Sequence, residues 1–197
     1  MKDKVLDDKV REEIIAAATG VFETYGFIKV SMQDISSASR KGRSSLYYYF
    51  NNKTEVFDAV VEKMLKHTLE LCAHSVSKDA SLAQNMANFQ LQKLKAIKVL
   101  VKQYYLVFRD LRHDPSLLFN KMRLLLDEEF ALIDQVLRWA IEKGEIKPLS
   151  PQDSRFLGET MVVALRSFEQ EIILFDRFPD FEEKLTWIVE IFCNGLK

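Results

Sequence analysis

The sequence predicts an all-α protein, and three observations carry this prediction. Glycine and proline are scarce, at 6 and 4 of 197 residues, which is roughly half the average share of each. So few turn-forming residues do not supply the many tight turns of a β-sandwich or β-barrel. Apolar residues recur instead at three- and four-residue spacing, which is typical of amphipathic helices.

The composition indicates a globular chain without a strong overall charge. Lys and Arg number 28 and Asp and Glu 29, for a formal net charge of -1, and 48% of residues are hydrophobic. These values exclude a disordered chain or a polybasic coat. Two cysteines, Cys72 and Cys193, are too few for a disulfide framework, so we expect free thiols in a reducing cytosol. No signal-peptide pattern or membrane span is evident, and a cytoplasmic, unanchored protein is expected.

The first two helices are delimited by capping signals. One is predicted from about Asp7 to Tyr25, followed by Gly26, where a left-handed C-terminal cap favours a residue without a Cβ. The next starts at Ser31, a capping hydroxyl with the acid Asp34 three residues on. Its inward-facing residues are predicted to be Ile35 and Ala38.

A tight turn then separates two short helices. Residues 39–42 contain Gly42 and are predicted to form this turn, and residues 43–50 form the third helix. Asn52 caps a fourth helix, with Glu55 at its third position. Three short helices joined in this way are the helix-turn-helix arrangement. We therefore expect a DNA-binding domain over residues 1–52.

Longer helices are predicted for the remainder, residues 53–197, which we expect to form a second domain. One helix of about thirty residues is marked by the apolar stripe from Met86 to Phe108, and Asp114–Pro115 signals another start. Further helices are predicted from Phe130 to Gly144, from Ser150 to Phe175 and from Asp180 to Asn194.

Positive charge gathers locally on the helix-turn-helix segment. Between residues 27 and 53 there are five basic residues and one acid, Asp34, a local excess of +4, so the rest of the chain sums to -5. Such a patch can neutralise phosphates and drive affinity for nucleic acid, although basic clusters are also common on solvated faces. The basic residues are Lys29, Arg40, Lys41, Arg43 and Lys53.

The third helix carries the residue types that read DNA. Arg43, Ser44 and Ser45 lie at its start, where side chains reach base edges in the major groove. Tyr47 and Tyr48 are predicted to face outward toward phosphates, with Tyr49 and Phe50 facing inward, as consecutive residues on a helix point in different directions. The full predicted DNA-binding set is Ser31, Lys41, Arg43, Ser44, Ser45, Tyr47, Tyr48 and Lys53.

Residues 10–57 resemble the N-terminal domain of TetR-family transcriptional repressors, and Leu46-Tyr47-Tyr48-Tyr49-Phe50 followed by Asn-Asn-Lys is the most specific part. The turn departs from the family pattern, because this chain has Arg40-Lys41-Gly42 where the family commonly has Gly-Val-Ser. Either Arg40 adopts the left-handed conformation, at a cost of about 1 kcal/mol, or the turn is reshaped around Gly42. The other matching residues are Ala18, Phe22, Gly26, Phe27, Ser31, Ile35, Ala38, Lys53 and Phe57.

The resemblance implies a homodimer on a near-palindromic duplex DNA operator and a larger helical domain that binds a small inducer and dimerises through its last two helices. Of the predicted DNA-binding residues, Ser45, Tyr47, Tyr48 and Lys53 match positions that usually contact DNA in the family. The final helix is apolar over a broad arc, as burial by its own domain and by a second subunit would require. The predicted dimerisation residues are Leu165, Phe168, Ile172, Trp187, Ile188 and Ile191.

Aromatic and methionine residues are frequent across the helices that enclose the ligand cavity in the family. They suit a bulky hydrophobic effector, although any one of them can equally be core. Arg166 and Glu169 could supply a polar anchor or lie on the surface. The predicted effector-binding residues are Phe89, Tyr104, Tyr105, Phe108, Phe119, Met122, Phe130, Met161 and Phe168.

No catalytic, cofactor or metal motif stands out. The histidines His67 and His74 share one helical face but bring too few ligands for zinc, and we find no phosphate loop or nucleophile motif. The leading hypothesis is a ligand-responsive dimeric repressor that is not an enzyme. An all-helical small-molecule binding protein without operator binding, or a module that docks an acidic protein, are the alternatives.

Overall fold

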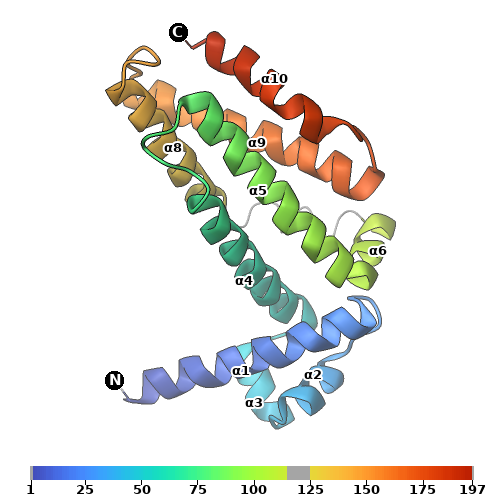
Figure 1. Cartoon of the computed structure of the whole chain (residues 1–197). Helices are drawn as coiled ribbons and strands as arrows, with labels where there is room; N and C mark the ends of the chain where they lie inside the picture. Colours follow the sequence, from blue (N-terminus) through green and yellow to red (C-terminus); the bar gives the residue numbers. More distant parts are fainter. Residues whose placement is uncertain (1, 115–124, 197) are drawn as a thin grey trace. The chain divides into compact units, whose positions relative to one another are not determined.

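The structure is a computed structural model that describes residues 2–114 and 125–196, with side chains described from residue 7 onward. Every regular element in these ranges is an α-helix (Figure 1), which confirms the predicted all-α class. The chain divides into two compact units: unit 1 comprises the described residues of Met1–Leu65 and Leu100–Lys121, and unit 2 those of Lys66–Val99 and Met122–Lys197. The predicted domain boundary at residues 52 and 53 stays a prediction.

Unit 1 contains α1 (Lys2–Tyr25), α2 (Met32–Ser39), α3 (Arg43–Tyr49), the first part of α4 (Lys53–Ala73) and α6 (Tyr105–His113). The predicted helices correspond closely, except that α1 begins five residues earlier than Asp7. The prediction for Ala38 is wrong, because Ala38 is exposed and Ser36 is buried. The Ser36 hydroxyl donates to the carbonyl of Lys41 at 2.8 Å, so this buried polar group ties α2 to the turn.

Three aromatic rings hold the helices of unit 1 together. Phe57 from α4 lies 5.1 Å from Phe22 of α1 and 4.8 Å from Phe27, between ring centroids. Ile35 of α2 and Leu46 of α3 are fully buried, so each short helix contributes an anchor to the unit. Burying such side chains is worth roughly 1.5–3 kcal/mol each, and short helices depend on this packing because they are marginal alone.

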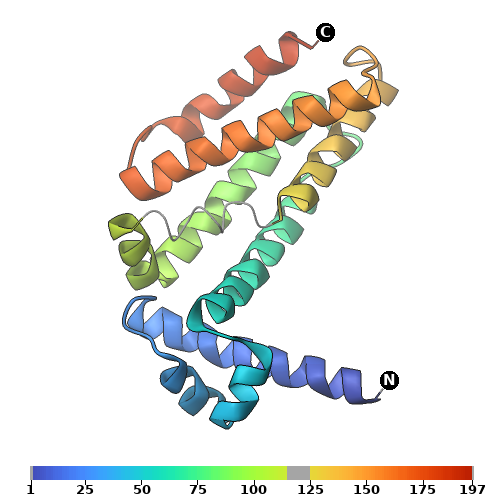
Figure 2. The ribbon, with the colours of Figure 1, turned by 180° about the vertical axis from the view of Figure 1, so that it is seen from behind.

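Unit 2 is built from the rest of α4, most of α5 (Leu82–Gln103), α8 (Leu126–Glu142), α9 (Pro151–Phe175) and α10 (Phe181–Asn194). The helices α9 and α10 lie side by side in both opposite views (Figures 1 and 2).

The start of α9 follows the sequence signals directly. Pro151 occupies the first turn, and the Ser150 hydroxyl accepts the N–H of Asp153 at 3.1 Å. Both features are favourable there, because the first N–H groups of a helix have no partner within it.

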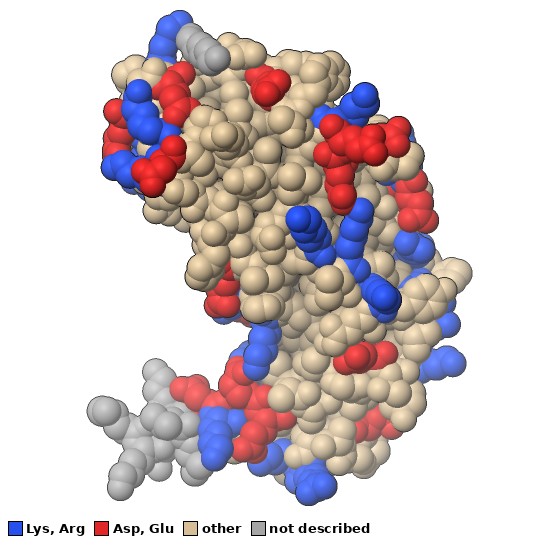
Figure 3. All heavy atoms as spheres, in the orientation of Figure 1, with Lys and Arg blue, Asp and Glu red and all other residues tan. Residues whose placement is uncertain are grey.

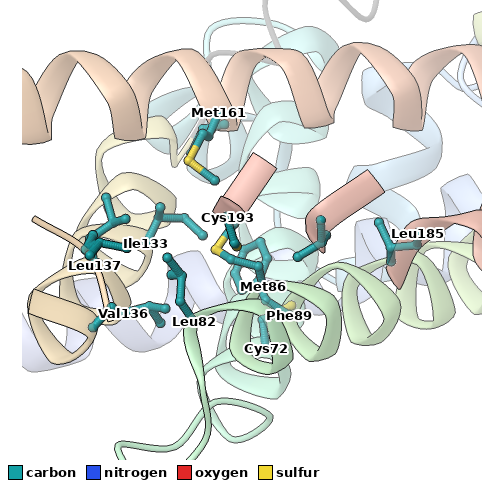
Figure 4. Packing of buried hydrophobic residues seen from close by; sticks show 14 of the residues in the cluster. Cys72, Leu82, Met86, Phe89, Ile133, Val136, Leu137, Met161, Leu185 and Cys193 are labelled. Carbon is teal, nitrogen blue, oxygen red and sulfur yellow. The ribbon is translucent and has the colours of Figure 1, made fainter. Parts of the chain in front are cut away.

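The core of unit 2 draws apolar side chains from every helix in the unit. Figure 4 shows Cys72 from α4, Met86 and Phe89 from α5, Ile133 and Leu137 from α8, Met161 from α9 and Leu185 and Cys193 from α10 gathered together. Both thiols are free and buried. Burial raises the pKa of Cys72 to about 12, so this thiol is neutral and unreactive.

The predicted thirty-residue helix is wrong, because it is two helices that break at Tyr104. Tyr104 has φ -102° and ψ 40°, outside the helical region, although no Gly or Pro occurs there. Its side chain is buried, and the chain beyond it turns so that α6 packs on α1. Tertiary packing therefore overrides the local periodicity. The helix start predicted at Asp114–Pro115 falls at the edge of the segment 115–124, which lies outside the described residues.

Close packing of α8 on α9 depends on Gly158. A Cβ built on Gly158 would lie 2.5 Å from Cε2 of the Phe130 ring, which is closer than real Cβ contacts. Gly158 itself is buried. Phe130, predicted to contact the effector, is thus half-buried against the α9 backbone.

We expect Gly158→Ala to lower the free energy of unfolding by about 1–3 kcal/mol, because the ring of Phe130 must move. Chemical denaturation measures this change. The control is Gly20→Ala on the exposed side of α1, where a Cβ would meet no atom within 4 Å. There we expect a gain of about 0.5–1 kcal/mol, since alanine favours the helix. Equal effects at the two glycines would contradict the packing described here.

Candidate nucleic-acid interface

The helix-turn-helix begins with a complete capping box at α2. The Ser31 hydroxyl accepts the N–H of Asp34 at 3.3 Å, and the Asp34 carboxylate accepts the N–H of Ser31 at 2.8 Å. The hydroxyl and the backbone N–H of Ser31 both donate to the Asp34 carboxylate, and these two hydrogen bonds lower the pKa of Asp34 below its ordinary value. Ser31, a predicted DNA contact, is exposed, and its hydroxyl already donates to Asp34 at 2.6 Å.

The turn between α2 and α3 is left-handed at Arg40. This residue has φ 54° and ψ 27°, and its N–H donates to the carbonyl of Ser37 at 3.3 Å. Gly42 has φ -59°, so the turn is not reshaped around the glycine. The backbone therefore keeps a left-handed residue at the end of α2, and arginine holds it at a cost of about 1 kcal/mol.

Helix α3 presents its polar side chains to solvent as the sequence predicts. Arg43 and Ser44 are exposed, and Tyr47 and Tyr48 are 42% and 73% exposed. Ser45 is half-buried. The exposed face of α3 therefore carries guanidinium, hydroxyl and phenol groups, which can form hydrogen bonds with DNA bases and phosphates.

The inward side of α3 anchors it to α1. Phe50 is buried at the end of α3, and the Arg11 guanidinium lies 5.2 Å from its ring centroid. The phenol of Tyr49 donates to the Asp7 carboxylate at 2.7 Å, and this hydrogen bond raises the pKa of Tyr49 to about 12. The predicted division of the aromatic string into outer and inner members is thus seen in the structure.

The two lysines predicted to contact DNA already have partners within unit 1. The ammonium of Lys41 pairs with the Glu13 carboxylate at 2.6 Å. Lys53 donates to the carbonyls of Phe27 and Ile28 at 2.9 and 3.1 Å and lies 4.6 Å from the Phe27 ring centroid. Burial lowers the pKa of Lys53, while the charge of Asp110 acts in the opposite direction. A phosphate contact from either lysine would share or replace these partners.

A buried carboxylate on α6 fixes the segment that follows α1. Oδ2 of Asp110 accepts the N–H groups of both Phe27 and Ile28 at 2.9 Å. The ammonium of Lys53, from α4, donates to the carbonyls of the same two residues. The segment is therefore held by α6 and α4 together. We call these four residues the Asp110 clamp.

Gly26 permits the close approach that the clamp needs. Its φ is +79°, a conformation that favours glycine. A Cβ at this position would lie 2.7 Å from Oδ2 of Asp110 and 3.3 Å from Leu106. The glycine predicted as a helix cap therefore also makes room for α6.

The clamp keeps the Asp110 carboxylate ionised. Burial alone would raise its pKa, but hydrogen bonds from the N–H groups of Ile28 and Phe27 and from Arg109 outweigh burial and lower it. The Arg109 guanidinium lies 3.2 Å from Oδ1. Charge-assisted hydrogen bonds of this kind are about twice as strong as neutral ones. Sequence reasoning missed Asp110, because its partners lie 82 and 83 residues away and no local pattern marks it.

The predicted effector-binding residues are divided between the units. Tyr104, Tyr105 and Phe108 belong to unit 1, where Tyr104 is buried and Tyr105 is exposed. Those in unit 2 range from the fully buried Phe89 to the partly exposed Phe168. Phe119 and Met122 lie outside the described residues. The remaining members, in unit 2, are Phe130 and Met161.

The predicted dimerisation residues differ in burial. Trp187 and Ile191 of α10 are 60% and 55% exposed. Phe192 of the same helix is also exposed, and the buried side chains of α10 include Leu185, Val189 and Cys193, at four-residue spacing. Three of the other predicted dimerisation residues are partly buried against the unit 2 core, namely Leu165, Ile172 and Ile188. The last one, Phe168, is partly exposed.

Across residues 2–114 and 125–196, no three or more His, Cys, Asp or Glu side chains gather in a way that could hold a metal ion. None of the helices there combines the length and hydropathy needed to cross a membrane. Figure 3 shows one face of the molecule, with a broad area over unit 2 that carries few charged side chains.

Comparison with known proteins places the helix-turn-helix in a defined family. Residues 14–60 match the model of bacterial regulatory proteins of the tetR family. The chain is 28% identical over 142 residues to the HTH-type transcriptional regulator SrpR of Pseudomonas putida, covering 71% of this chain and 64% of that protein. It is 36% identical over 50 residues to the probable acrEF/envCD operon repressor of Escherichia coli K12, covering 25% of this chain and 23% of that protein.

The fold is also found among solved structures. A TetR-family transcriptional regulator from Pectobacterium atrosepticum superposes with a TM-score of 0.67 at 20% sequence identity, covering 98% of this chain and 96% of that one. At this identity the likeness shows the shared fold. The family model matches residues 14–60, and the helical arrangement extends over nearly the whole chain.

We expect Asp110→Asn to lower the free energy of unfolding by about 1–3 kcal/mol at neutral pH, because two N–H groups lose a charged acceptor. The measurement is denaturation across pH. The pKa of Asp110 is lower in the folded state than in the unfolded state, where it is about 4. The stabilisation from Asp110 is therefore present above the unfolded-state pKa and is lost as the pH falls through the folded-state pKa. The difference in the free energy of unfolding between the wild-type protein and Asp110→Asn therefore becomes smaller as the pH falls.

The control is Asp79→Asn, which makes the same chemical change at an exposed carboxylate in the loop before α5. We expect it to change stability by less than about 0.5 kcal/mol. An Asp110→Asn protein as stable as the control variant would contradict the role assigned to the clamp.

Proposed function

Because the chain belongs to the TetR family of transcriptional regulators, we propose that it is a repressor that binds a near-palindromic operator as a homodimer. We further propose that a small effector bound in unit 2 controls this binding. The dimer sets the spacing of two α3 helices, which must match successive major grooves about 34–36 Å apart.

The exposed face of α3 is the observation that carries the proposal. Arg43 and Ser44 at its start are available to base edges, and Tyr47 and Tyr48 to phosphates. The half-buried Ser45 is positioned between these groups in sequence and completes the proposed base-reading set. The anchors Tyr49 and Phe50 hold α3 on α1, so this face is preorganised for binding.

The exposed apolar side chains of α9 and α10 support the proposed dimer. Trp187, Ile191 and Phe192 of α10 are exposed, as are Phe156 and Val163 of α9. Large exposed apolar groups on adjacent helices mark an interaction surface. A second copy of the same two helices would bury them in an intersubunit four-helix bundle.

The Asp110 clamp suggests how unit 2 could influence DNA binding. Helix α5 lies in unit 2 up to Val99, and the chain continues through α6 to Asp110 in unit 1. A change in unit 2 that displaces α6 would pull on the segment at Phe27 and Ile28, and through Lys53 on α4. An effector acts in this scheme only by its different affinity for the two conformations.

Two measurements on random duplex DNA test the function. In vitro selection should recover a near-palindrome, and binding repeated at two salt concentrations should weaken steeply as salt rises. Recovery of no preferred sequence, with only shallow salt dependence, would overturn operator binding and favour the small-molecule binding protein as the alternative.

We expect Tyr47→Phe to weaken binding to all sequences alike by about threefold to tenfold, because it removes a phosphate contact. Ser45→Ala and Arg43→Ala should instead change the preferred base at one position, by about 1–3 kcal/mol of discrimination. Binding titrations on the selected operator and its single-base variants measure both effects. Tyr25→Phe, an exposed tyrosine at the end of α1, is the control and should change neither. Uniform losses from all three variants would show that Arg43 and Ser45 do not read bases.

We expect Trp187→Glu combined with Ile191→Glu to weaken dimerisation by about a hundredfold or more, since two apolar anchors become charged. Sedimentation at several concentrations measures this change. Val99→Glu, which replaces a 63% exposed apolar side chain on α5, is the matched control and should leave the dimer intact. A wild-type monomer, or equal losses in both variants, would rule out the proposed interface.

A further inference from the structure

An ion pair in unit 1 involves one of the two lysines that are predicted to contact DNA. The ammonium of Lys41, in the turn between α2 and α3, lies 2.6 Å from the carboxylate of Glu13 on α1. Lys41 is two residues before Arg43, the first member of the proposed base-reading set. The other predicted lysine, Lys53, donates instead to neutral carbonyls. The ammonium of Lys41 is therefore held by an anion, which is the kind of group that a DNA phosphate is.

The Glu13–Lys41 pair lies in contact with solvent. The side chain of Lys41 is 27% exposed and that of Glu13 is 44% exposed. The side chain of Asp110, in contrast, is 3% exposed. Water solvates both charges of an exposed ion pair, so such a pair contributes little to stability. Little free energy therefore opposes the exchange of Glu13 for another anion.

The turn between α2 and α3 has supports other than this ion pair. The carbonyl of Lys41 accepts the Ser36 hydroxyl at 2.8 Å, which ties the backbone of the turn to α2. Ile35 before the turn and Leu46 after it are both fully buried. Because backbone and core contacts fix the turn, the side chain of Lys41 can change its partner while α3 stays in place.

Glu13 carries a full negative charge at neutral pH. The hydrogen bond and the positive charge of Lys41 lower the pKa of Glu13, and Lys9 on the same helix acts in the same direction. A phosphate that approaches Lys41 therefore meets a second anion at the same ammonium, and like charges repel. Since every nucleotide carries the same phosphate group, this repulsion is independent of the base sequence.

The neighbouring acid on α1 has a different partner. The carboxylate of Glu12 lies 2.7 Å from the ammonium of Lys63 on α4. Two adjacent carboxylates of α1 therefore bind two different elements, Glu12 the helix α4 and Glu13 the turn before α3. This arrangement provides a matched control, because the same chemical change at Glu12 removes the same charge but leaves the Lys41 pair intact.

We propose that Glu13 is an internal competitor of DNA phosphate for Lys41. In the unbound protein Glu13 holds Lys41, and on DNA the ammonium leaves Glu13 and binds a phosphate oxygen. The exchange lowers the affinity for all duplex sequences alike and leaves base reading by α3 unchanged, so less protein is held on DNA outside the operator. This inference rests on the proposed function, since it assigns a regulatory contact to the same DNA-binding surface.

Binding titrations of the full-length protein test the competition. The two probes are a duplex of random sequence and the selected operator, each titrated at several salt concentrations. We expect Glu13→Gln to bind both duplexes about twofold to fivefold more tightly, because one charge that opposes the phosphate contact is removed. Lys41→Met should weaken both and lower the slope of log affinity against log salt by about 1, as the loss of one phosphate contact predicts.

A double variant and the matched control identify the cause of the tighter binding. Glu13→Gln added to Lys41→Met should have no further effect, since the ammonium for which Glu13 competes is gone. Glu12→Gln should change the affinity much less than Glu13→Gln, because Glu12 is paired with Lys63 and salt screens its effect on more distant phosphates.

A measurement without DNA tests the ion pair itself. Carbon NMR follows the titration of the Glu13 carboxyl group in the wild-type protein and in Lys41→Met. We expect Lys41→Met to raise the pKa of Glu13 toward its ordinary value, because the main cause of the lowering is removed. A pKa of Glu13 that stays the same in Lys41→Met would show that the pair does not form in solution, and the proposal would fail.

The binding data can overturn the proposal in three ways. Unchanged or weaker binding by Glu13→Gln would show that Glu13 does not compete, and weaker binding would indicate that it positions the turn. Equal tightening by Glu12→Gln would indicate a general charge effect. Tightening that persists in the Lys41→Met background would indicate that the new amide contacts DNA itself.

These failures are distinct from a failure of the proposed function. In each of the three cases the wild-type protein still binds duplex DNA and its operator, so operator binding stands while the role of Glu13 is lost. A wild-type protein that binds neither duplex would overturn operator binding and, with it, this proposal.

Discussion

The two hydrogen bonds that Asp110 accepts from Phe27 and Ile28 are the constraint on which unit 1 depends. They join the end of α1 to a helix far along the chain, and Lys53 joins the same residues to α4. Gly26 leaves the space for this approach. The helices that present α3 therefore pack with α6, which supplies a buried charge to the residues that follow α1. A perturbation of α6 has a direct physical path to the DNA-binding helices.

A second buried charge system lies in unit 2, and its balance differs from that of the clamp. Asp110 is matched by N–H donors and an adjacent guanidinium, which lower its pKa. Glu169 accepts a hydrogen bond from Gln90 and shares the ammonium of Lys93 with Glu129, and burial raises its pKa. Buried ionic groups contribute little net stability compared with apolar packing.

Local signals predicted much of this fold. The capping residues Ser31 and Ser150 begin their helices as expected, and the outward and inward members of the aromatic string follow helical geometry. Contacts between distant residues were not predictable, and Asp110 is the clearest case. The break at Tyr104 was missed for the same reason, because packing of α6 on α1 outweighs a continuous periodicity. A signal for the buried Lys93 was present, since this residue lies four residues from both Phe89 and Ile97 on the apolar stripe of its helix.

Amide hydrogen exchange at Phe27 and Ile28 tests the central role of the clamp most directly. These residues follow the end of α1, where amides in an ordinary exposed turn exchange rapidly. We expect both amides to be protected as strongly as those in the middle of α1, and the protection to fall in Asp110→Asn while the amides of α9 are unchanged. Rapid exchange at both positions in the wild-type protein would contradict the clamp and, with it, the path from α6 to the DNA-binding helices.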